Sequence, residues 1–334
     1  MNALYINELL LLVHDQITST LTWRRIVQVF QKNSAFDLRN LLSGTDHLTT
    51  SLIKTYSSRN PSILTNTVNV GSFQDHIAST SLIKSTIEKT LSKNQNIIFT
   101  IVFNKTGQIL SYGKRKEGYS LHHRDAALIS NMVVSSGIFQ QSLENWVPIC
   151  LPNSIDSSGF AQLYMCKPEE HDFCLVLISN FYKEEEFHMV SEISKELQKK
   201  WEDKISVPRA DLCEINSGEN EKMLFSGKDG VLDILSAIVI KPDYGQCILF
   251  NYEFSSEFDK SFVKIIDLSN RKNLNFIVHT SNNLTTTLWK RDELTICAIF
   301  GSLTTHDELI ESLQAFHNKL MSNDTKYFTP VINF

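Results

Sequence analysis

The chain has 334 residues, 42% of them hydrophobic and 21% charged, which are ordinary values for a globular protein of two or three domains. Its net charge of −5 excludes the basic footprint that is typical of nucleic-acid-binding proteins. The longest apolar runs are far below the roughly 18 residues of a membrane span, and no basic residue precedes the N-terminal apolar run as in a signal peptide.

Residues 1–92 are predicted to form helices and loops. Apolar residues recur at helical spacing from 4 to 17, and Thr22 is placed to cap a second helix. Thr45 or Asp46 begins another helix, which Asn60-Pro61 ends. A short turn over 36–42, a longer helix capped by Ser72 and ending near Leu91, and a single strand signal at 68–70 complete this part.

At Asn96 the pattern changes to apolar runs that are rich in β-branched and aromatic residues, separated by turn residues. The run 173–178 is apolar almost throughout, which predicts a central strand that is buried on both faces. The predicted elements are strands at 97–103, 108–112, 146–151, 160–166 and 173–178, with helices at 121–134 and 183–201.

After a polar linker around Pro208, a similar order of elements is predicted to repeat, although the two parts share little primary sequence. The first half of the repeat is the less regular one. Its predicted elements are two weak strands within 211–227, a short helix at 231–240, a strand or insertion at 247–252, strands at 275–279, 285–290 and 294–300, a helix at 306–320 and a short apolar end at 327–334.

The order β-β-α-β-β-β-α is that of the longin fold, a five-stranded sheet between helices. We therefore expect the α/β (α+β) class, with tandem longin-type domains that each hold a five-stranded antiparallel sheet flanked by helices. The expected domains are 1–92, the helical C-terminal part of a further longin unit, followed by longin domains at 96–202 and 206–334. Amphipathic helices without a sheet leave apolar stripes uncovered, which indicates either a partner site or an incomplete domain.

No catalytic constellation is found in the sequence, and no cofactor or metal is expected. His123-Arg124-Asp125 lacks the asparagine that a kinase catalytic loop needs, and it is interpreted as a solvated helix start. Gly107 to Lys114 has the wrong spacing for a phosphate loop. The six cysteines form no C-x-x-C pair and are predicted to be buried, reduced thiols, namely Cys150, Cys166, Cys174, Cys213, Cys247 and Cys297.

Several motifs resemble those of the Mon/SAND family of vacuolar fusion proteins. The segment 36–46 reads F-D-L-R-N-L-L-S-G-T-D, and 146–152 reads W-V-P-I-C-L-P. Ser158-Gly159-Phe160 and the run C-L-V-L-I-S at 174–179 follow at a similar spacing to the family's motifs. The resemblance extends over most of the chain and depends on the order of the motifs as well as on their residues.

The resemblance implies a subunit of a heterodimeric exchange factor. Its partners would be a Ccz-type longin protein and a late-endosomal, Rab-seven-type GTPase, and no nucleic acid is expected. The complex would be cytoplasmic and recruited peripherally to the late-endosome or vacuole membrane, where it would act in vacuole fusion, endosome maturation, protein transport and autophagy. Exchange of this kind needs no acid, base or nucleophile. The alternative is a longin scaffold or adaptor without exchange activity.

The chain departs from the family pattern at its N-terminus. Family members carry a polar tail and a first longin sheet before the helix that resembles 8–17, whereas this chain starts at that helix. The resemblance therefore implies an incomplete gene model, or else a reduced homologue with altered partners.

Three residues of the best-matched N-terminal motif are candidates for partner contact, namely Phe36, Arg39 and Asp46. The competing interpretation is local: Phe36 packs, Asp46 or Asp37 caps a helix, and Arg39 pairs with an acid. The basic run 114–116 is likewise a candidate for contact with anionic lipid, or else a solvated turn.

Overall fold

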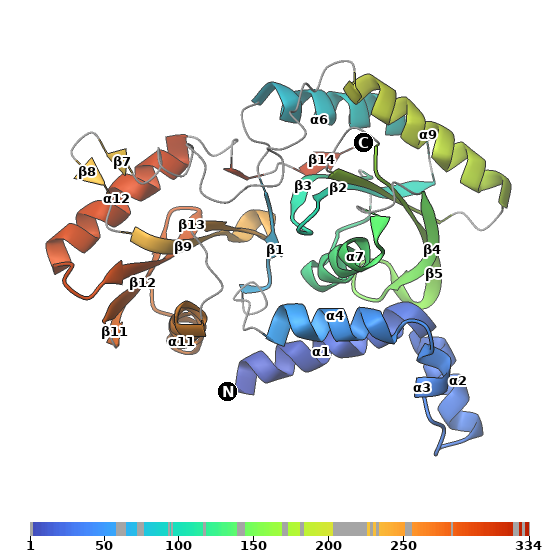
Figure 1. Cartoon of the computed structure of the whole chain (residues 1–334), viewed down its shortest axis with the longest axis horizontal. Coiled ribbons are helices and arrows are strands. Elements are labelled where there is room, and N and C mark those ends of the chain that lie inside the picture. The colour runs from blue at the N-terminus through green and yellow to red at the C-terminus, as the bar shows by residue number, and fades with distance from the viewer. Residues whose placement is uncertain are drawn as a thin grey trace. The chain divides into compact units, whose positions relative to one another are not determined.

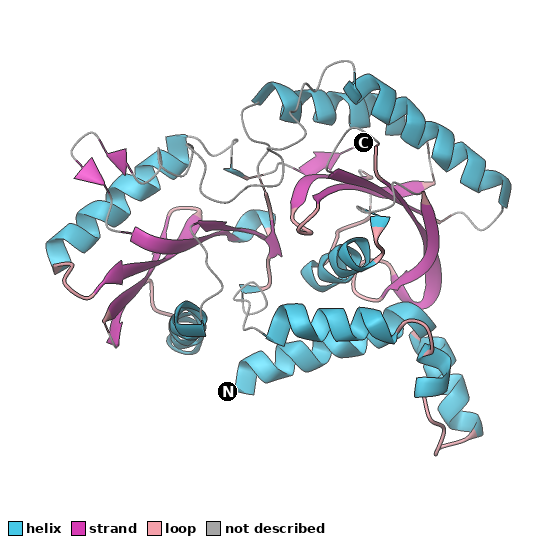
Figure 2. Ribbon diagram, in the orientation of Figure 1, coloured by secondary structure: helices cyan, strands magenta, loops and turns pink. Residues whose placement is uncertain are grey.

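The computed structural model describes residues 3–57, 65–71, 77–92, 94, 96–115, 118–138, 144–168, 173–180, 184–202, 226–227, 230–231, 234–250, 256–281, 283–322, 327–328 and 331–333. The chain divides into two compact units, each of which is built around one six-stranded sheet with helices packed on it (Figure 2). The first unit comprises Leu9–Thr55, Phe73–Cys213 and Pro330–Phe334. The second unit comprises Met1–Glu8, Tyr56–Ser72 and Glu214–Thr329.

The sheet of the first unit has the strand order β14-β3-β2-β6-β5-β4. All its neighbouring strands are antiparallel except β14, which runs parallel to β3. The strands are β2 (Ile97–Asn104), β3 (Ile109–Lys114), β4 (Asn145–Leu151), β5 (Asp156–Cys166), β6 (Phe173–Ser179) and β14 (Val331–Asn333).

Helices cover both faces of this sheet, as its central strands require. Every residue of β2 and of β6 is buried, so neither face of the two strands can be left in water. Helices α6 (Ile77–Leu91) and α9 (Glu184–Glu202) lie on one face, and α7 (His123–Ser135) lies on the other (Figure 1).

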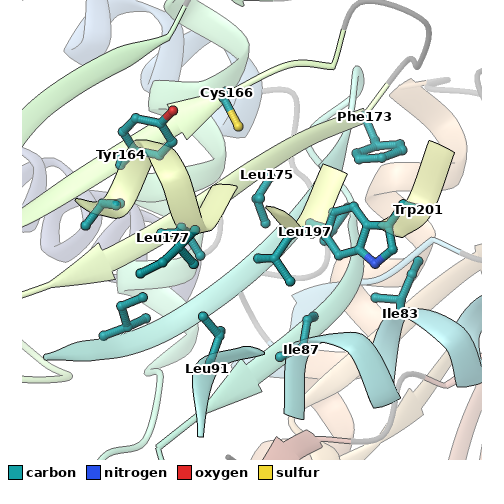
Figure 3. Close-up of a cluster of buried hydrophobic side chains, with 14 of the residues drawn as sticks. Ile83, Ile87, Leu91, Tyr164, Cys166, Phe173, Leu175, Leu177, Leu197 and Trp201 are labelled. Carbon is teal, nitrogen blue, oxygen red and sulfur yellow. The ribbon is translucent and has the colours of Figure 1, made fainter. Parts of the chain in front are cut away.

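The core under α6 and α9 is a continuous cluster of buried apolar side chains (Figure 3). Trp201, near the end of α9, is fully buried and meets Phe173 of β6 edge to face, with the ring centroids 5.8 Å apart. The other labelled members come from α6, α9 and the strands β5 and β6, namely Ile83, Ile87, Leu91, Leu197, Tyr164, Cys166, Leu175 and Leu177.

The sheet of the second unit has the order β1-β10-β9-β13-β12-β11, and β1 is its only parallel strand. Helices α11 (Ser256–Lys272) and α12 (His306–Ser322) lie on opposite faces of it (Figure 1). The strands are β1 (Val68–Asn69), β9 (Ile234–Lys241), β10 (Gln246–Phe250), β11 (Phe276–Ser281), β12 (Leu284–Arg291) and β13 (Leu294–Gly301). A separate short pair joins β7 (Ser226–Gly227) to β8 (Gly230–Val231), and a 3-10 turn, η1 (Pro242–Tyr244), links β9 to β10.

One sequence prediction in this unit is wrong, and one helix was not predicted. The segment 231–240 was predicted to be a helix, but most of it forms strand β9. Its sequence I-L-S-A-I-V-I-K is rich in β-branched residues and is buried at seven of its eight positions, as suits a central strand. The helix lies later, at α11, where Phe262, Ile265 and Ile266 are buried at helical spacing, a periodicity that the sequence analysis overlooked.

With these corrections the predicted fold class is confirmed, because both units show the order β-β-α-β-β-β-α with five antiparallel strands. The expected five-stranded sheets are extended, since each one gains a sixth, short parallel strand. The strand signal at 68–70 becomes β1 beside β10, and the end of the chain becomes β14 beside β3.

The N-terminal segment forms four helices, α1 (Ala3–Leu21), α2 (Trp23–Lys32), α3 (Arg39–Leu42) and α4 (Asp46–Ser57). The predicted cap is confirmed, because the Thr22 hydroxyl accepts a hydrogen bond from the backbone N–H of Arg25 at 3.3 Å. The predicted stop at Asn60-Pro61, the cap at Ser72 and the linker around Pro208 lie outside the described residues, as do residues 211–225 of the weak strands.

The predicted domain limits of 1–92, 96–202 and 206–334 stay a prediction. Helix α6, which falls within 1–92, shares the apolar core of the first sheet. Residues Leu9–Thr55 also belong to the first unit, whereas Tyr56–Ser72 belong to the second.

Gly107 closes the turn between β2 and β3, which the residues Asn104-Lys105-Thr106-Gly107 predict as a hairpin, and an alanine there is expected to destabilise the first unit. Its φ of +81° strains any side chain, and an added Cβ would lie 2.4 Å from Oγ of Ser130 in α7, which donates to the Gly107 carbonyl at 2.7 Å. We expect Gly107→Ala to lower the free energy of unfolding by about 2 kcal/mol, measured by urea denaturation. Gly118→Ala is the control, because Gly118 has a φ of +79° but nothing within 4 Å, so about 1 kcal/mol is expected. Equal losses would show that the contact with Ser130 has no effect.

Candidate partner-binding surface

The candidates Phe36 and Arg39 lie on the segment that joins α2 to α4. Arg39 is exposed and pairs with its neighbour Asp37, with Nη2 2.7 Å from Oδ2 and Nε 3.0 Å from both carboxylate oxygens. The Arg39 hydrogen bonds hold the pKa of the Asp37 carboxyl below its usual value. Phe36 is half-buried, and its backbone N–H donates to the Asn33 carbonyl at 3.1 Å.

Asp46 begins α4 and accepts a hydrogen bond from the N–H of Gly44 at 3.2 Å. Gly44 has a φ of +89°, so its N–H can turn back toward the helix start. Of the competing interpretation, the Arg39 ion pair is present, and Asp37 accepts from the backbone N–H of Arg39, the first residue of α3, at 3.0 Å. The Asp46 carboxylate accepts instead from the Gly44 N–H, which lies before α4. These interactions leave open whether Phe36, Arg39 and Asp46 contact a partner, and that assignment stays a prediction.

A buried polar cluster fixes the N-terminal helices to the first unit. Asp15 of α1 is almost fully buried, and its Oδ2 lies 3.3 Å from Nε of Arg124 in α7. Asn131 of α7 donates to Oε1 of Gln16 at 3.2 Å and to the carbonyl of Leu48, in α4, at 2.8 Å. Three helices are thus joined by polar contacts, of which the two made by Asn131 are buried and the ion pair of Arg124 is partly exposed.

Asn153, in the turn between β4 and β5, completes the cluster by bridging two carboxylates. Its side-chain amide donates at 2.9 Å both to Oδ2 of Asp15 and to Oδ1 of Asp125, while its own Oδ1 accepts from Arg124 at 3.0 Å. The backbone N–H of Asn153 donates to the other oxygen of Asp125 at 3.0 Å. Burial raises the pKa of Asp125, and these hydrogen bonds oppose the rise.

His123-Arg124-Asp125 begins helix α7 as predicted, but the prediction that this helix start is solvated is wrong for Asp125. Asp125 is fully buried, and burial lowers the pKa of His123 to about 4. The helix start is capped by His122, whose Nδ1 accepts from the N–H of Arg124 at 3.3 Å. The burial of Asp125 could not be predicted from its neighbours in sequence, because its hydrogen-bond partner Asn153 lies 28 residues further along the chain.

The tryptophan of the second motif also packs locally. Trp146 of β4 meets Phe187 of α9 edge to face, with the ring centroids 5.3 Å apart, and meets Tyr164 of β5 at 6.2 Å. Pro148 in the same strand is exposed, which suits a residue without an N–H on the last strand of a sheet. This motif therefore stabilises the edge of the sheet.

The basic run at 114–116 is partly engaged within the fold. Nη2 of Arg115 donates to the Asn94 carbonyl at 2.6 Å, and Lys116 lies outside the described residues. Contact with lipid stays a prediction. No described helix is long and apolar enough to cross a membrane, and the described histidine, cysteine and acidic residues form no group of three that suits a metal ion.

The cysteines are buried and free wherever they are described, so that prediction is confirmed for five of the six; Cys213 lies outside the described residues. Burial raises the pKa of Cys150 to about 12 and that of Cys166 to about 11. Sγ of Cys166 also lies 2.7 Å from Oγ of Ser194 and accepts from Nε2 of Gln198 at 3.0 Å.

These thiols are expected to resist alkylation in the folded protein. A rise in the pKa of Cys150 from 9.0 to about 12 lowers its thiolate fraction at pH 8 by roughly 1000-fold, and the thiolate is the reactive form. We expect a Cys213→Ser chain treated with iodoacetamide to remain unlabelled, as measured by mass spectrometry. The same chain in urea, where burial is lost, is the control and should take up five labels. Fast labelling of Cys150 before unfolding would contradict the prediction.

The first unit matches a family profile described as the second longin domain of FUZ, MON1 and HPS1, over residues 96–199. The chain is 33% identical over 196 residues to vacuolar fusion protein MON1 homolog A of Gallus gallus, covering 57% of this chain and 33% of that protein. It is 32% identical over 168 residues to protein SAND of Takifugu rubripes, covering 50% and 31%. A MON1 protein of Yarrowia lipolytica is 32% identical over 154 residues, covering 46% and 27%. The matches span about a third of the length of these relatives, and the family resemblance predicted from the motifs is confirmed.

Proposed function

Because this chain is a longin-domain protein related to the Mon/SAND vacuolar fusion proteins, we propose that it is a subunit of a heterodimeric exchange complex for a late-endosomal or vacuolar Rab-type GTPase. The observation that carries the proposal is the longin match at 96–199, which coincides with the five antiparallel strands and the two helices of the first unit. The second unit repeats the same order of elements, as expected of a protein built from tandem longin domains.

The proposed partner in the complex is a Ccz-type longin protein, and the proposed substrate is a Rab-seven-type GTPase. Exchange requires only that the complex bind the nucleotide-free GTPase more tightly than the nucleotide-bound form, so that binding energy displaces the nucleotide. Such a mechanism uses contact surfaces rather than a chemical active site. The proposed place of action is the cytoplasmic face of late endosomes or the vacuole, in vacuole fusion, endosome maturation, protein transport and autophagy, with peripheral membrane contact.

The test is release of fluorescently labelled GDP from a Rab-seven-type GTPase, measured with the chain co-purified with a Ccz-type partner. We expect release to be accelerated at least about tenfold, which corresponds to about 1.4 kcal/mol. If the predicted contacts are correct, Phe36→Ala and Arg39→Glu reduce this acceleration without lowering the unfolding midpoint, because both side chains lie partly or wholly in solvent. Arg271→Glu is the matched control, since Arg271 is an exposed arginine on α11 of the second unit.

The alternative is a longin scaffold or adaptor without exchange activity. A stable complex with the Ccz-type partner that leaves GDP release unchanged would support the scaffold and contradict the exchange proposal.

A further inference from the structure

A surface cavity of about 480 Å³ lies in the first unit, where the end of α1, the helices α2 and α3, and strand β5 meet. Its volume is within the range of sites that hold small ligands or protruding side chains. Leu41 belongs to the first motif that resembles the Mon/SAND family and Phe160 to another, so the cavity brings together two segments that are far apart in sequence.

The cavity has an apolar part and a cationic part. Leu21, Leu41 and Phe160 provide apolar lining, while Arg24, Arg25 and Gln28 contribute polar side chains from α2. Helix α2 packs against β5, so the two parts are held on neighbouring elements of one unit. An apolar wall beside two guanidinium groups suits a ligand that carries both an apolar side chain and negative charge.

The two arginines are available for such a ligand. Both are exposed, and in the part of the chain that the structure describes neither guanidinium forms an ion pair. The backbone N–H of Arg25 donates to the capping Thr22 hydroxyl, which fixes the start of the helix and leaves both arginine side chains outside the cap.

The local charge is opposite to that of the chain as a whole. The cavity lining contains two arginines and no acidic residue. Helices α2 and α3 with the segment between them, residues 23–42, contain four basic side chains and a single acidic one, flanked by Asp15 and Asp46, whereas the net charge of the protein is −5. The single acid, Asp37, is already paired with Arg39. The cavity therefore lies in a positive region of an acidic protein, which attracts negative partners and disfavours basic ones.

We propose that this cavity docks a short acidic segment of a partner protein, with one large apolar side chain against Leu21, Leu41 and Phe160 and flanking carboxylates on Arg24 and Arg25. The planar guanidinium groups bind carboxylates bidentately, which gives a peptide orientation as well as affinity. An acidic peptide suits the cavity better than an anionic membrane, because a short segment can place an apolar side chain and flanking carboxylates together, as the lining does with its leucines, phenylalanine and arginines. The proposal is independent of nucleotide exchange.

The test uses three fluorescein-labelled hexapeptides and the full chain, with binding followed by fluorescence anisotropy. The first probe is Glu-Asp-Leu-Phe-Glu-Asp, the second replaces its acids by the matching amides, and the third replaces Leu-Phe by Ala-Ala. We expect the first to bind with a dissociation constant on the order of 10–100 µM, and each of the other two at least about tenfold more weakly. Affinity for the first probe should fall as salt is raised from 50 to 300 mM, because the contacts are between exposed charges.

Variants locate the site. The double variant Arg24→Gln/Arg25→Gln should bind the acidic probe at least about tenfold more weakly than the parent chain does. Leu41→Ala should bind it severalfold more weakly. Lys32→Gln is the matched control, a basic residue on the same helix that does not line the cavity, and it should bind as the parent does. Circular dichroism spectra that match the parent would show that the exposed substitutions leave the fold intact.

Three results would overturn the proposal. The first is equal binding of the acidic and amide peptides, and the second is no binding of any probe at 1 mM. The third is that the peptides do not bind, whereas the chain binds vesicles of anionic phospholipid in a way that depends on Arg24 and Arg25. The last result would assign the arginines to a membrane contact instead. Because no GTPase is present in the assay, a negative result here leaves the exchange proposal unaffected, and the reverse also holds.

Discussion

Replacement of Trp201 by alanine is expected to lower the free energy of unfolding of the first unit by about 3–5 kcal/mol. Trp201 is among the largest fully buried side chains of the protein, and it packs between α6, the end of α9 and Phe173 of β6. Its removal leaves a cavity in a core that is covered on every side, and the sheet and helices have little freedom to collapse into it. Amide hydrogen exchange of β6 is the measurement, because it reports this unit alone.

Two further tryptophan substitutions test the packing argument. Trp23→Ala should cost less than about 1 kcal/mol, because Trp23 of α2 is 47% exposed. Trp201→Phe should cost less than Trp201→Ala, since the phenyl ring fills most of the space. Trp201→Phe also removes the buried indole N–H of Trp201, which has no hydrogen-bond acceptor among the described residues. A larger loss for Trp23→Ala than for Trp201→Ala would contradict the assignment of the core.

Replacement of Arg124 by alanine is expected to lower the free energy of unfolding by about 2–3 kcal/mol. The Arg124 side chain is 21% exposed and that of Asp15 is 7% exposed, so the substitution leaves a buried carboxylate without its counter-charge. It also removes the donor to Oδ1 of Asn153, the residue that connects Asp15 to Asp125. The full loss seen for deeply buried pairs is not expected, because the guanidinium is partly in water. Urea denaturation followed by tryptophan fluorescence in a Trp289→Phe background measures it.

A surface pair is the control for burial. Nε of Arg271 lies 2.9 Å from Oδ1 of Asp267, closer than the 3.3 Å between Arg124 and Asp15, yet the Arg271 side chain is 59% exposed. Arg271→Ala should therefore change stability by no more than about 0.5 kcal/mol. The double variant Arg124→Ala/Asp15→Asn should lose less free energy of unfolding than the two single variants together. The reason is that Asp15→Asn removes the buried negative charge that Arg124→Ala leaves without a counter-charge. Additive losses would show that the two side chains do not interact.

The sequence by itself determined the class of the fold and the place of most elements in it. The apolar run 173–178 and the β-branched run 97–103 predicted central strands, and both strands are completely buried. The cap at Thr22 and the turn closed by Gly107 were also identified from residue type alone, because these signals are local. The family resemblance followed from the spacing of several motifs, and the longin match over 96–199 confirms it.

Only the tertiary structure decided which distant segments meet. The sequence showed a strand signal at 68–70 and an apolar end at 327–334, but only the structure decided that β1 pairs with β10 and that β14 pairs with β3. Asp125 was expected in water and lies in a buried cluster because Asp15, Arg124 and Asn153 come from three separate elements. The cavity beside Arg24 and Arg25 exists because α2 packs on β5. Propensity and capping act over a few neighbouring residues, whereas pairing, burial and the shape of a surface depend on contacts between residues that are far apart in the chain.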